Sequence, residues 1–414
     1  MQKLRIAVLG TVGADPFAGM AWMHLQLAAG LLRLGHEVRY VETTSAWPYD
    51  VDLGGPVNDA TYTLAYLARV TVRFGMGQHW AWRRSFGDGA WFGPAAPGIE
   101  AWLADCDLVL NVTGSTCLLE DGFATRAKLV YVGTDPVGDE LRHAAGEAYK
   151  VAHLAAHDAV LTYGENIGTP RSPLPPLPGL VGHMRQPVLM DMWAPQPGDP
   201  IMRDRFTTVG NWRQNGNDDV FQGRPLRWSK HHEFLKFIDV PRLAGIPVEL
   251  ATNLRDNERN SAQVAAADEP GKARGAVGMD HEHIQLLKDG GWVLADGPAL
   301  STDPFTYRRY LMASKAEFSV AREFNVLPRS GWFSERSACY LAAGRPVVTQ
   351  DTGFTDVLPC GEGLIGFSTL EEAVEGLRAV QADYPRHARA ALAIAREHFA
   401  AEVVLPRMLA DLGA

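Results

Sequence analysis

Short apolar runs alternate with helix-like stretches in this chain, and the alternation occurs twice. The first series contains RIAVLG, EVRYVET, DLVLNV, KLVYVGT and HDAVLTY, and the second contains FTTVGNW, PVELAT, GWVLAD, AEFSVA and RPVVTQ. A short, continuous apolar run is typical of a strand that is covered on both faces, as in a parallel sheet. Strands separated by helices form right-handed βαβ units. The sequence therefore predicts an α/β fold with two parallel sheets.

A proline-rich stretch separates the two series. Nine prolines lie between Thr169 and Ile201, and proline lacks the amide hydrogen that helices and central strands require. The chain has 414 residues, which is too long for one hydrophobic core. We expect two Rossmann-like domains, a connector between them, and a C-terminal helix for which a return to the first domain is one option. The expected ranges are 1–188, 189–202, 203–390 and 391–414.

Composition excludes several classes of protein. The chain carries 39 Lys and Arg against 48 Asp and Glu, a formal net charge of −9, which argues against a general nucleic-acid or anionic-membrane binder. A C-x-x-C spacing would indicate a metal or redox site. The four cysteines of this chain do not have it. No apolar run approaches the roughly 18 residues of a membrane span. We expect a cytoplasmic protein without a membrane segment or nucleic-acid partner, and a homodimer stays open.

The loop between the first strand and the first helix is a candidate binding site. Its sequence, GTVGADPFAG, places Gly13 and Gly19 where a backbone can approach a ligand and helix amides are free. A plain tight turn explains the same glycines. The loop is not G-x-G-x-x-G, so a dinucleotide-binding dehydrogenase is disfavoured.

Motifs in both halves resemble those of GT-B glycosyltransferases. The stretch from Gly19 through His24 to GLLRLGHEV resembles their first helix, and SGWFSERSACYLAAGRPVVTQDTGF resembles their sugar-nucleotide-binding region. VGNW with SKHHEF resembles the start of their donor domain, and TYGENIG with RQPV resembles the crossing between domains. The resemblance spans nearly the whole chain and is closest to the retaining, metal-independent bacterial branch (group 1, or family 4-like). It implies a GT-B architecture, with two Rossmann-like domains facing a central cleft.

The resemblance implies cationic residues at the donor diphosphate. A departing nucleoside diphosphate gains negative charge, which cations and helix-end amides stabilise when no metal is present. Lys230 occupies the position of the family's diphosphate-binding lysine. The alternative is that Lys230 is a solvated lysine on the surface of a helix. The family's arginine position holds Asn211. Arg322 and Arg329 are therefore candidates for the second cation.

Other donor contacts are expected around the helix that follows. The family's paired glutamates, spaced E-x7-E, are replaced here by Gly331 and Cys339. Glu335 is a candidate for the ribose hydroxyls, and an ion pair with neighbouring Arg336 is its alternative. Ser330 and Ser334 could cap this helix and present its amides to phosphate. The candidates for contact with the donor sugar are Asp351, Thr352 and Gly353.

The acceptor side should come from the N-terminal domain. Asp135, at the end of KLVYVGT, is expected to act on or hold an acceptor hydroxyl. His24 could serve in its place or be packed in the core. The aromatic stretch Trp80–Phe92 could shape an apolar acceptor pocket or cover the sheet.

The sequence thus predicts an enzyme, a glycosyltransferase with a nucleoside-diphosphate sugar as co-substrate, UDP or TDP foremost. The acceptor bears a hydroxyl group and is a small molecule, such as a natural product, or a glycan. No metal or resident cofactor is expected, and the resemblance favours retention of configuration. Two alternatives stay open: a sugar-nucleotide epimerase, and a catalytically degenerate binding or partner protein, which the absent glutamate pair suggests.

Overall fold

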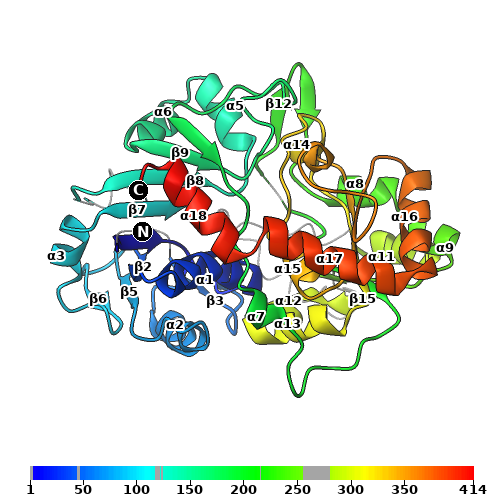
Figure 1. Cartoon of the computed structure of the whole chain (residues 1–414), viewed down its shortest axis with the longest axis horizontal. Coiled ribbons are helices and arrows are strands. Elements are labelled where there is room, and N and C mark those ends of the chain that lie inside the picture. The colour runs from blue at the N-terminus through cyan, green and yellow to red at the C-terminus, as the bar shows by residue number, and fades with distance from the viewer. Residues whose placement is uncertain (1–2, 44–46, 117–121, 123–124, 215, 255–279) are drawn as a thin grey trace.

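The computed structural model describes residues 3–43, 47–116, 122, 125–214, 216–254 and 280–414. Figure 1 shows an N-terminal half and a C-terminal half, each built around a sheet, with the last helices running across both. The polar segment Arg255–Met279, for which the sequence predicts a surface loop, lies outside the described residues.

The N-terminal half contains, in the described residues, an eight-stranded sheet with strand order β10-β9-β8-β7-β1-β2-β5-β6. Its neighbouring strands are parallel except for the edge pair β5 and β6. The strands are β1 (Arg5–Leu9), β2 (Glu37–Glu42), β5 (Trp80–Arg83), β6 (Trp91–Phe92), β7 (Leu108–Val112), β8 (Lys128–Gly133), β9 (Ala159–Thr162) and β10 (Leu180–His183). A small hairpin, β3 (Tyr49–Asp50) with β4 (Gly55–Pro56), lies beside it.

The C-terminal half contains, among the residues described, a six-stranded parallel sheet with order β15-β14-β11-β16-β17-β18. Its strands are β11 (Phe206–Val209), β14 (Val248–Thr252), β15 (Trp292–Asp296), β16 (Ala316–Ser319), β17 (Val347–Gln350) and β18 (Leu364–Phe367). A separate antiparallel hairpin, β12 (Asp219–Phe221) with β13 (Arg224–Leu226), lies between β11 and the next helix. The expectation of two parallel sheets in an α/β fold is confirmed.

Helices follow most strands, as βαβ units require. In the N-terminal half they are α1 (Ala18–Arg33), α2 (Thr61–Arg73), α3 (Ile99–Ala104), α5 (Gly138–Ala144), α6 (Ala148–Ala155) and α7 (Met190–Trp193). The C-terminal half has α8 (His231–Lys236), α9 (Val240–Ala244), α11 (Asp280–Asp289), α12 (Gly297–Ser301), α13 (Pro304–Ala313), α14 (Glu323–Val326), α15 (Glu335–Ala342) and α16 (Leu370–Ala382). The chain ends with α17 (Tyr384–His398) and α18 (Ala401–Asp411).

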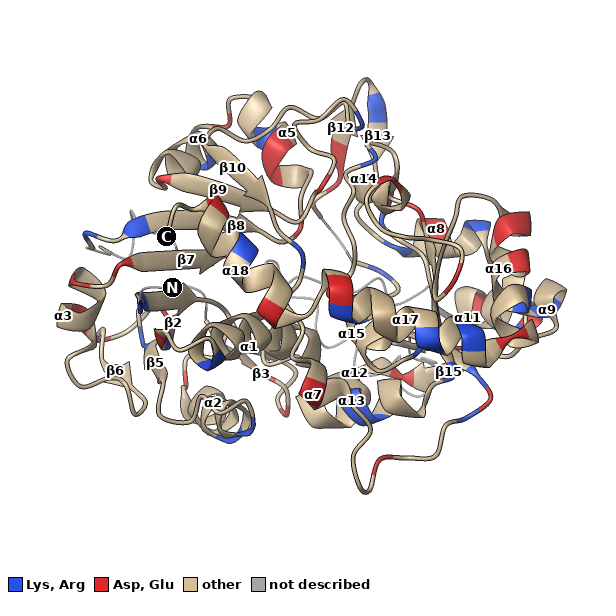
Figure 2. Cartoon of the chain, in the orientation of Figure 1, with Lys and Arg blue, Asp and Glu red and all other residues tan. Residues whose placement is uncertain are grey.

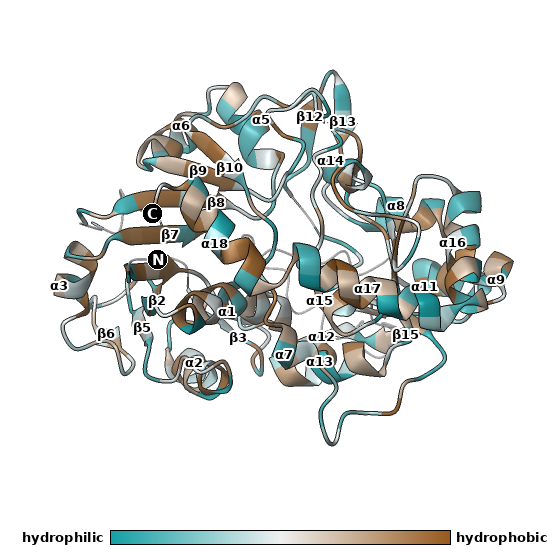
Figure 3. Ribbon diagram, viewed as in Figure 1, coloured by the Kyte–Doolittle hydropathy of each residue, from teal (hydrophilic) through white to brown (hydrophobic). Residues whose placement is uncertain are grey.

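The continuous apolar runs are explained by burial on both faces of each sheet. In β1, Ile6 and Val8 belong to one hydrophobic cluster and Ala7 and Leu9 to another on the opposite face. Because successive strand residues point to opposite faces, a strand between two helical layers must be apolar throughout. Figure 3 shows the hydrophobic colour concentrated along the strands of the first sheet.

Three features differ from the sequence-based expectation. The proline-rich stretch is not only a connector, because β10 forms within it and adds to the first sheet, and α7 follows. The aromatic stretch Trp80–Phe92 contains β5 and the edge strand β6, and both Trp80 and Trp82 are buried. Strand β18, which forms one edge of the second sheet beside β17, is not among the strands that the sequence predicts.

The end of the chain joins the two halves. Helix α17 packs on α15, whereas α18 packs on α1 and β10. The helix expected over 391–414 is interrupted at Ala400, whose extended backbone pairs with Val188. The return to the N-terminal half is therefore made by the short helix α18 alone. No helix of the described residues combines the length and apolar character needed to cross a bilayer.

Candidate functional site

Residues that follow strands of one sheet contact residues that follow strands of the other. Trp332 Nε1 donates a hydrogen bond to the carbonyl oxygen of Thr134 at 3.0 Å. The amide of Asn166 donates to the carbonyl oxygen of Ser330 at 3.1 Å. Ligands of open α/β sheets bind outside the carboxyl ends of the strands. The junction between the two halves is therefore the candidate site.

A narrow pocket in the C-terminal half lies beside this junction, since Trp332 both lines it and contacts Thr134. It is lined by Lys230, Val320, Ala321, Trp332, Phe333, Ser334, Arg336, Thr349, Gln350, Thr352 and Phe354. Lys230 directly precedes α8, and Ser334 directly precedes α15. The structure thus brings together Lys230, Ser334 and Thr352, three residues that the sequence assigns to the donor.

The pocket has an excess of positive charge. Burial, followed by the charges of Arg336 and Arg322, lowers the pKa of Lys230 well below its usual value. No described residue forms a hydrogen bond or ion pair with the Lys230 ammonium. Arg336, by contrast, is held by the carboxylate of Glu317 at 2.6 Å and by the carbonyl oxygen of Val209 at 2.7 Å. An anion beside Lys230 would stabilise its charged form, so the pocket is suited to an anionic group.

Arg322 links the pocket to the N-terminal half. Its Nη1 donates to Asp135 Oδ2 at 2.5 Å, and its Nη2 donates to Gln214 Oε1 at 3.2 Å. The buried Nε has no hydrogen-bond partner among the residues that the structure describes. Two expected site residues from opposite halves, one assigned to the donor and one to the acceptor, therefore form an ion pair across the junction.

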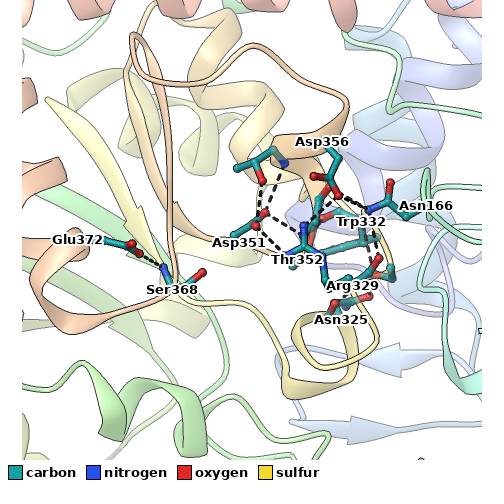
Figure 4. Close-up of polar contacts among 12 residues, drawn as sticks. Asn166, Asn325, Arg329, Trp332, Asp351, Thr352, Asp356, Ser368 and Glu372 are labelled. Atoms are coloured by element: carbon teal, nitrogen blue, oxygen red, sulfur yellow. Dashed lines mark hydrogen bonds and ion pairs between the residues drawn. The ribbon is translucent and has the colours of Figure 1, made fainter. Parts of the chain in front are cut away.

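Arg329 and Asp351 belong to a separate polar network, shown in Figure 4. Arg329 contacts Asp356 at 2.9 Å and Asp351 at 3.4 Å. Asp351 also accepts hydrogen bonds from the amide of Gly353 and the hydroxyl of Thr355. The Arg329 guanidinium is thus paired within its own loops, which leaves Arg322 as the better-placed second cation beside Lys230.

Asn166 organises these loops and was not singled out from the sequence. Its Nδ2 donates to the carbonyl oxygens of Gly353 at 2.9 Å and Arg329 at 3.2 Å. A Cβ at Gly353 would lie 2.5 Å from this Nδ2, and a Cβ at Gly331 would lie 2.7 Å from the Asn166 amide nitrogen. The motif TYGENIG indicates the crossing between the halves, but nothing in the motif marks its asparagine.

Glu335 faces the N-terminal half. Its Oε1 accepts from Gln26 Nε2 at 3.1 Å and from Cys339 Sγ at 3.0 Å. Burial raises the pKa of Glu335 to about 7. Its expected alternative, an ion pair with Arg336, is wrong because Arg336 pairs with Glu317. Ser330 is fully buried, and its hydroxyl donates to Asn325 Oδ1.

The loop after β1 is occupied by the chain's own carboxylate. The amides of Gly13 and Ala14 donate to Glu42 at 2.8 and 2.6 Å, so a ligand there would have to displace Glu42. Burial raises the pKa of this carboxyl to about 7. Gly19 is exposed in the first turn of α1, and Asn211 is exposed after β11.

His24 is packed rather than open to the junction. Its side chain is fully buried, and Nδ1 lies 2.8 Å from the Met20 carbonyl oxygen. Burial lowers the pKa of His24 to about 4. A Cβ at Gly10 would lie 2.3 Å from this ring, so the glycine makes room for it. No atom of the His24 side chain is exposed to a substrate, so the structure favours a packed His24 over a catalytic one.

The described part of the chain contains no group of three or more His, Cys, Asp or Glu side chains arranged to hold a metal ion.

Solved structures with the same fold were found. HepE of Anabaena in complex with UDP matches with a TM-score of 0.52 and 13% identity over 100% of both chains. An alpha-glucosyltransferase in complex with UDP and a 13-mer DNA matches with a TM-score of 0.52 and 12% identity over 100% of both chains. A glycosyltransferase of Rickettsia africae ESF-5 matches with a TM-score of 0.51 and 11% identity over 99% of this chain and 98% of the other. No protein-family model and no curated protein matches the sequence. The chain has the GT-B fold of these glycosyltransferases.

Proposed function

We propose that this protein is a glycosyltransferase that transfers a sugar from a nucleoside-diphosphate sugar to a hydroxyl group of an acceptor. The observation that carries the proposal is the ammonium of Lys230, which has no partner among the described residues and lies near the charges of Arg336 and Arg322, in a pocket of the C-terminal half beside the junction. A diphosphate supplies the negative charge that this pocket lacks. UDP is the first candidate nucleotide because HepE and the alpha-glucosyltransferase were both solved with it, and TDP is the second.

The main contribution of the protein would be electrostatic. As the bond between sugar and diphosphate breaks, negative charge grows on the leaving group. Lys230 and Arg322 would stabilise this charge, and the first amides of α15, which follow Ser334, would add hydrogen bonds. The donor sugar is the co-substrate, and the reaction would proceed with retention, in which the leaving phosphate accepts the proton of the acceptor hydroxyl.

The acceptor would bind on the N-terminal side of the junction, near Asp135. We propose a small hydroxyl-bearing molecule. The alpha-glucosyltransferase was solved with DNA, but the present chain has a net charge of −9. Figure 2 shows acidic and basic residues interspersed over its helices. A DNA acceptor would instead require a surface with an excess of Lys and Arg.

A thermal-shift panel with UDP, TDP, GDP and ADP tests the proposal. A ligand at 100 times its Kd stabilises the folded chain by about 2.7 kcal/mol, so the preferred nucleotide should raise the unfolding temperature most. A charged hydrogen bond contributes about 1.5–3 kcal/mol, so Lys230→Ala should weaken binding by about 10- to 150-fold. Lys236→Ala is the matched control, because Lys236 ends the helix that Lys230 precedes, is largely exposed and pairs with Glu233. Equal affinity of wild type and Lys230→Ala for every nucleotide would exclude Lys230 from the site.

One observation favours a second candidate, a degenerate GT-B protein that binds the nucleotide sugar without turning it over. The two glutamate positions of the family hold Gly331 and Cys339. Incubation of the purified chain with UDP-glucose separates the two functions. Release of UDP with an acceptor supports the enzyme, binding without release supports the degenerate protein, and an isomerised sugar nucleotide would indicate an epimerase.

A further inference from the structure

The hairpin β12–β13 connects the pocket to the N-terminal half. It lies between β11 and α8, so Gln214 precedes it and Lys230 follows it. Leu226 of the hairpin packs with Val137, at the start of α5, and with Phe324 of α14. Residues on both flanks of this hairpin therefore reach the candidate diphosphate site, while its own side chains contact the opposite half.

Trp228, just after β13, is fixed in place. Its amide donates to Asp218 Oδ1 at 2.8 Å, and the amide of Arg227 donates to Glu323 Oε2 at 3.0 Å. The indole meets the ring of Phe324 edge-on, with centroids 5.2 Å apart and an interplanar angle of 89°. The amide bonds hold the backbone at Trp228, and the contact with Phe324 holds the indole.

The guanidinium of Arg322 lies on this indole. Its central carbon is 3.8 Å from the ring centroid of Trp228. On its other sides the guanidinium contacts Asp135 and Gln214, and Nε is unpartnered. The charge of Arg322 is also among the causes that lower the pKa of Lys230, so the two cations lie near each other. Arg322 is thus held between the pocket and a half-exposed carboxylate of the opposite half.

We propose that Trp228 is a positioning residue for the donor: it keeps Arg322 at the edge of the pocket while this arginine exchanges Asp135 for the donor diphosphate. The inference rests on the proposed function. A cation–π contact acts on the guanidinium face and leaves its edge N–H groups free, so Arg322 can change partner without leaving the ring. A diphosphate offers more charge and more acceptor oxygens than one carboxylate, which favours the exchange.

The exchange connects the two substrates. In the structure the Asp135 carboxylate is paired with Arg322. Once the donor diphosphate takes over Arg322, the carboxylate becomes available to an acceptor hydroxyl. Donor binding should therefore precede productive acceptor binding.

Calorimetric titration with UDP, and with uridine as the phosphate-free reference, tests the proposal. A desolvated cation–π contact corresponds to about a 5- to 30-fold change in affinity. Trp228→Leu should weaken UDP binding by that factor and leave uridine binding unchanged, while Trp228→Phe should retain most of the UDP affinity. In an Arg322→Gln background, Trp228→Leu should have no further effect. Asp135→Asn should tighten UDP binding severalfold, again only when Arg322 is present.

Trp91→Leu is a matched control, because Trp91 also lies near an arginine, Arg83, but at 5.8 Å and at the far edge of the first sheet. The proposal is overturned if Trp228→Leu weakens UDP and uridine equally, if its effect persists in the Arg322→Gln background, or if Asp135→Asn leaves UDP binding unchanged or weaker. The Asp135→Asn result decides the matter if the Trp228 variants do not fold. UDP binding that depends on Lys230 but not on Trp228 would overturn this proposal alone. Failure of the wild-type chain to bind UDP would overturn it together with a UDP-dependent function.

Discussion

Replacement of Asn166 by alanine should destabilise the protein markedly, because this side chain joins loops from both halves. Asn166 is fully buried, and its Nδ2 donates to two backbone carbonyl oxygens, of Gly353 at 2.9 Å and of Arg329 at 3.2 Å. A buried acceptor that loses its partner costs about 1–3 kcal/mol. The bond to Gly353 is buried, whereas the bond to Arg329 is only partly buried, so we expect a loss of about 1–4 kcal/mol in the free energy of unfolding.

Urea denaturation followed by circular dichroism measures this loss. Arg142→Ala is the control, because it removes an exposed hydrogen bond from Arg142 to Asn217, also between the halves. Such an exposed contact is worth less than about 0.5 kcal/mol. A loss for Asn166→Ala no larger than that of the control would refute the reasoning, since it would show that the carbonyl oxygens find other donors. Because Asn166 does not contact Lys230, nucleotide affinity should fall less than stability.

Two further predictions follow from buried groups at the junction. Gly353→Ala should cost more than about 1 kcal/mol, because Gly353 has φ 93° and its new Cβ would lie 2.5 Å from Asn166 Nδ2; unchanged stability in urea would contradict this. Burial raises the pKa of Glu335 to about 7 from the 4.5 of a free carboxyl, so the folded state favours the protonated form. Stability should then fall as pH rises from about 4.5 to 7. Between pH 5 and 8, the free energy of unfolding of Glu335→Gln should fall by about 1–3 kcal/mol less than that of the wild type. Equal losses in both proteins would show that Glu335 does not titrate in this range.

Most strands inside the two sheets could be predicted from the sequence, and so could the edge strand β15, whereas the edge strands β6, β10 and β18 could not. A central strand such as β7, in which every residue is buried, leaves a continuous apolar run. Strand β10 is largely half-exposed, contains Gly182 and is surrounded by prolines. An edge strand has one neighbour and less cover, so its apolar signal is weaker than the turn signals around it.

The candidate site was predicted in part. Lys230, Ser334 and Thr352 were found because their motifs are continuous in sequence, and the structure places all three at one pocket. The roles of Asn166 and Trp228 depend on contacts with residues that are distant in the chain, such as Arg329 and Arg322. Such contacts produce no local periodicity, so no pattern in a single sequence indicates them.

The absence of the glutamate pair has a structural explanation. Gly331 has φ 75°, and a side chain there would begin 2.7 Å from the backbone nitrogen of Asn166, so a glutamate could not occupy this position without separating the two halves. The second position, Cys339, is fully buried and donates to Glu335. The close contact between Gly331 and Asn166 therefore occupies the place that the first glutamate of such a pair would need. Under the proposed function, recognition of a donor would depend on the cations and the helix-end amides of the pocket, so substitution of Lys230 or Arg322 should reduce activity most.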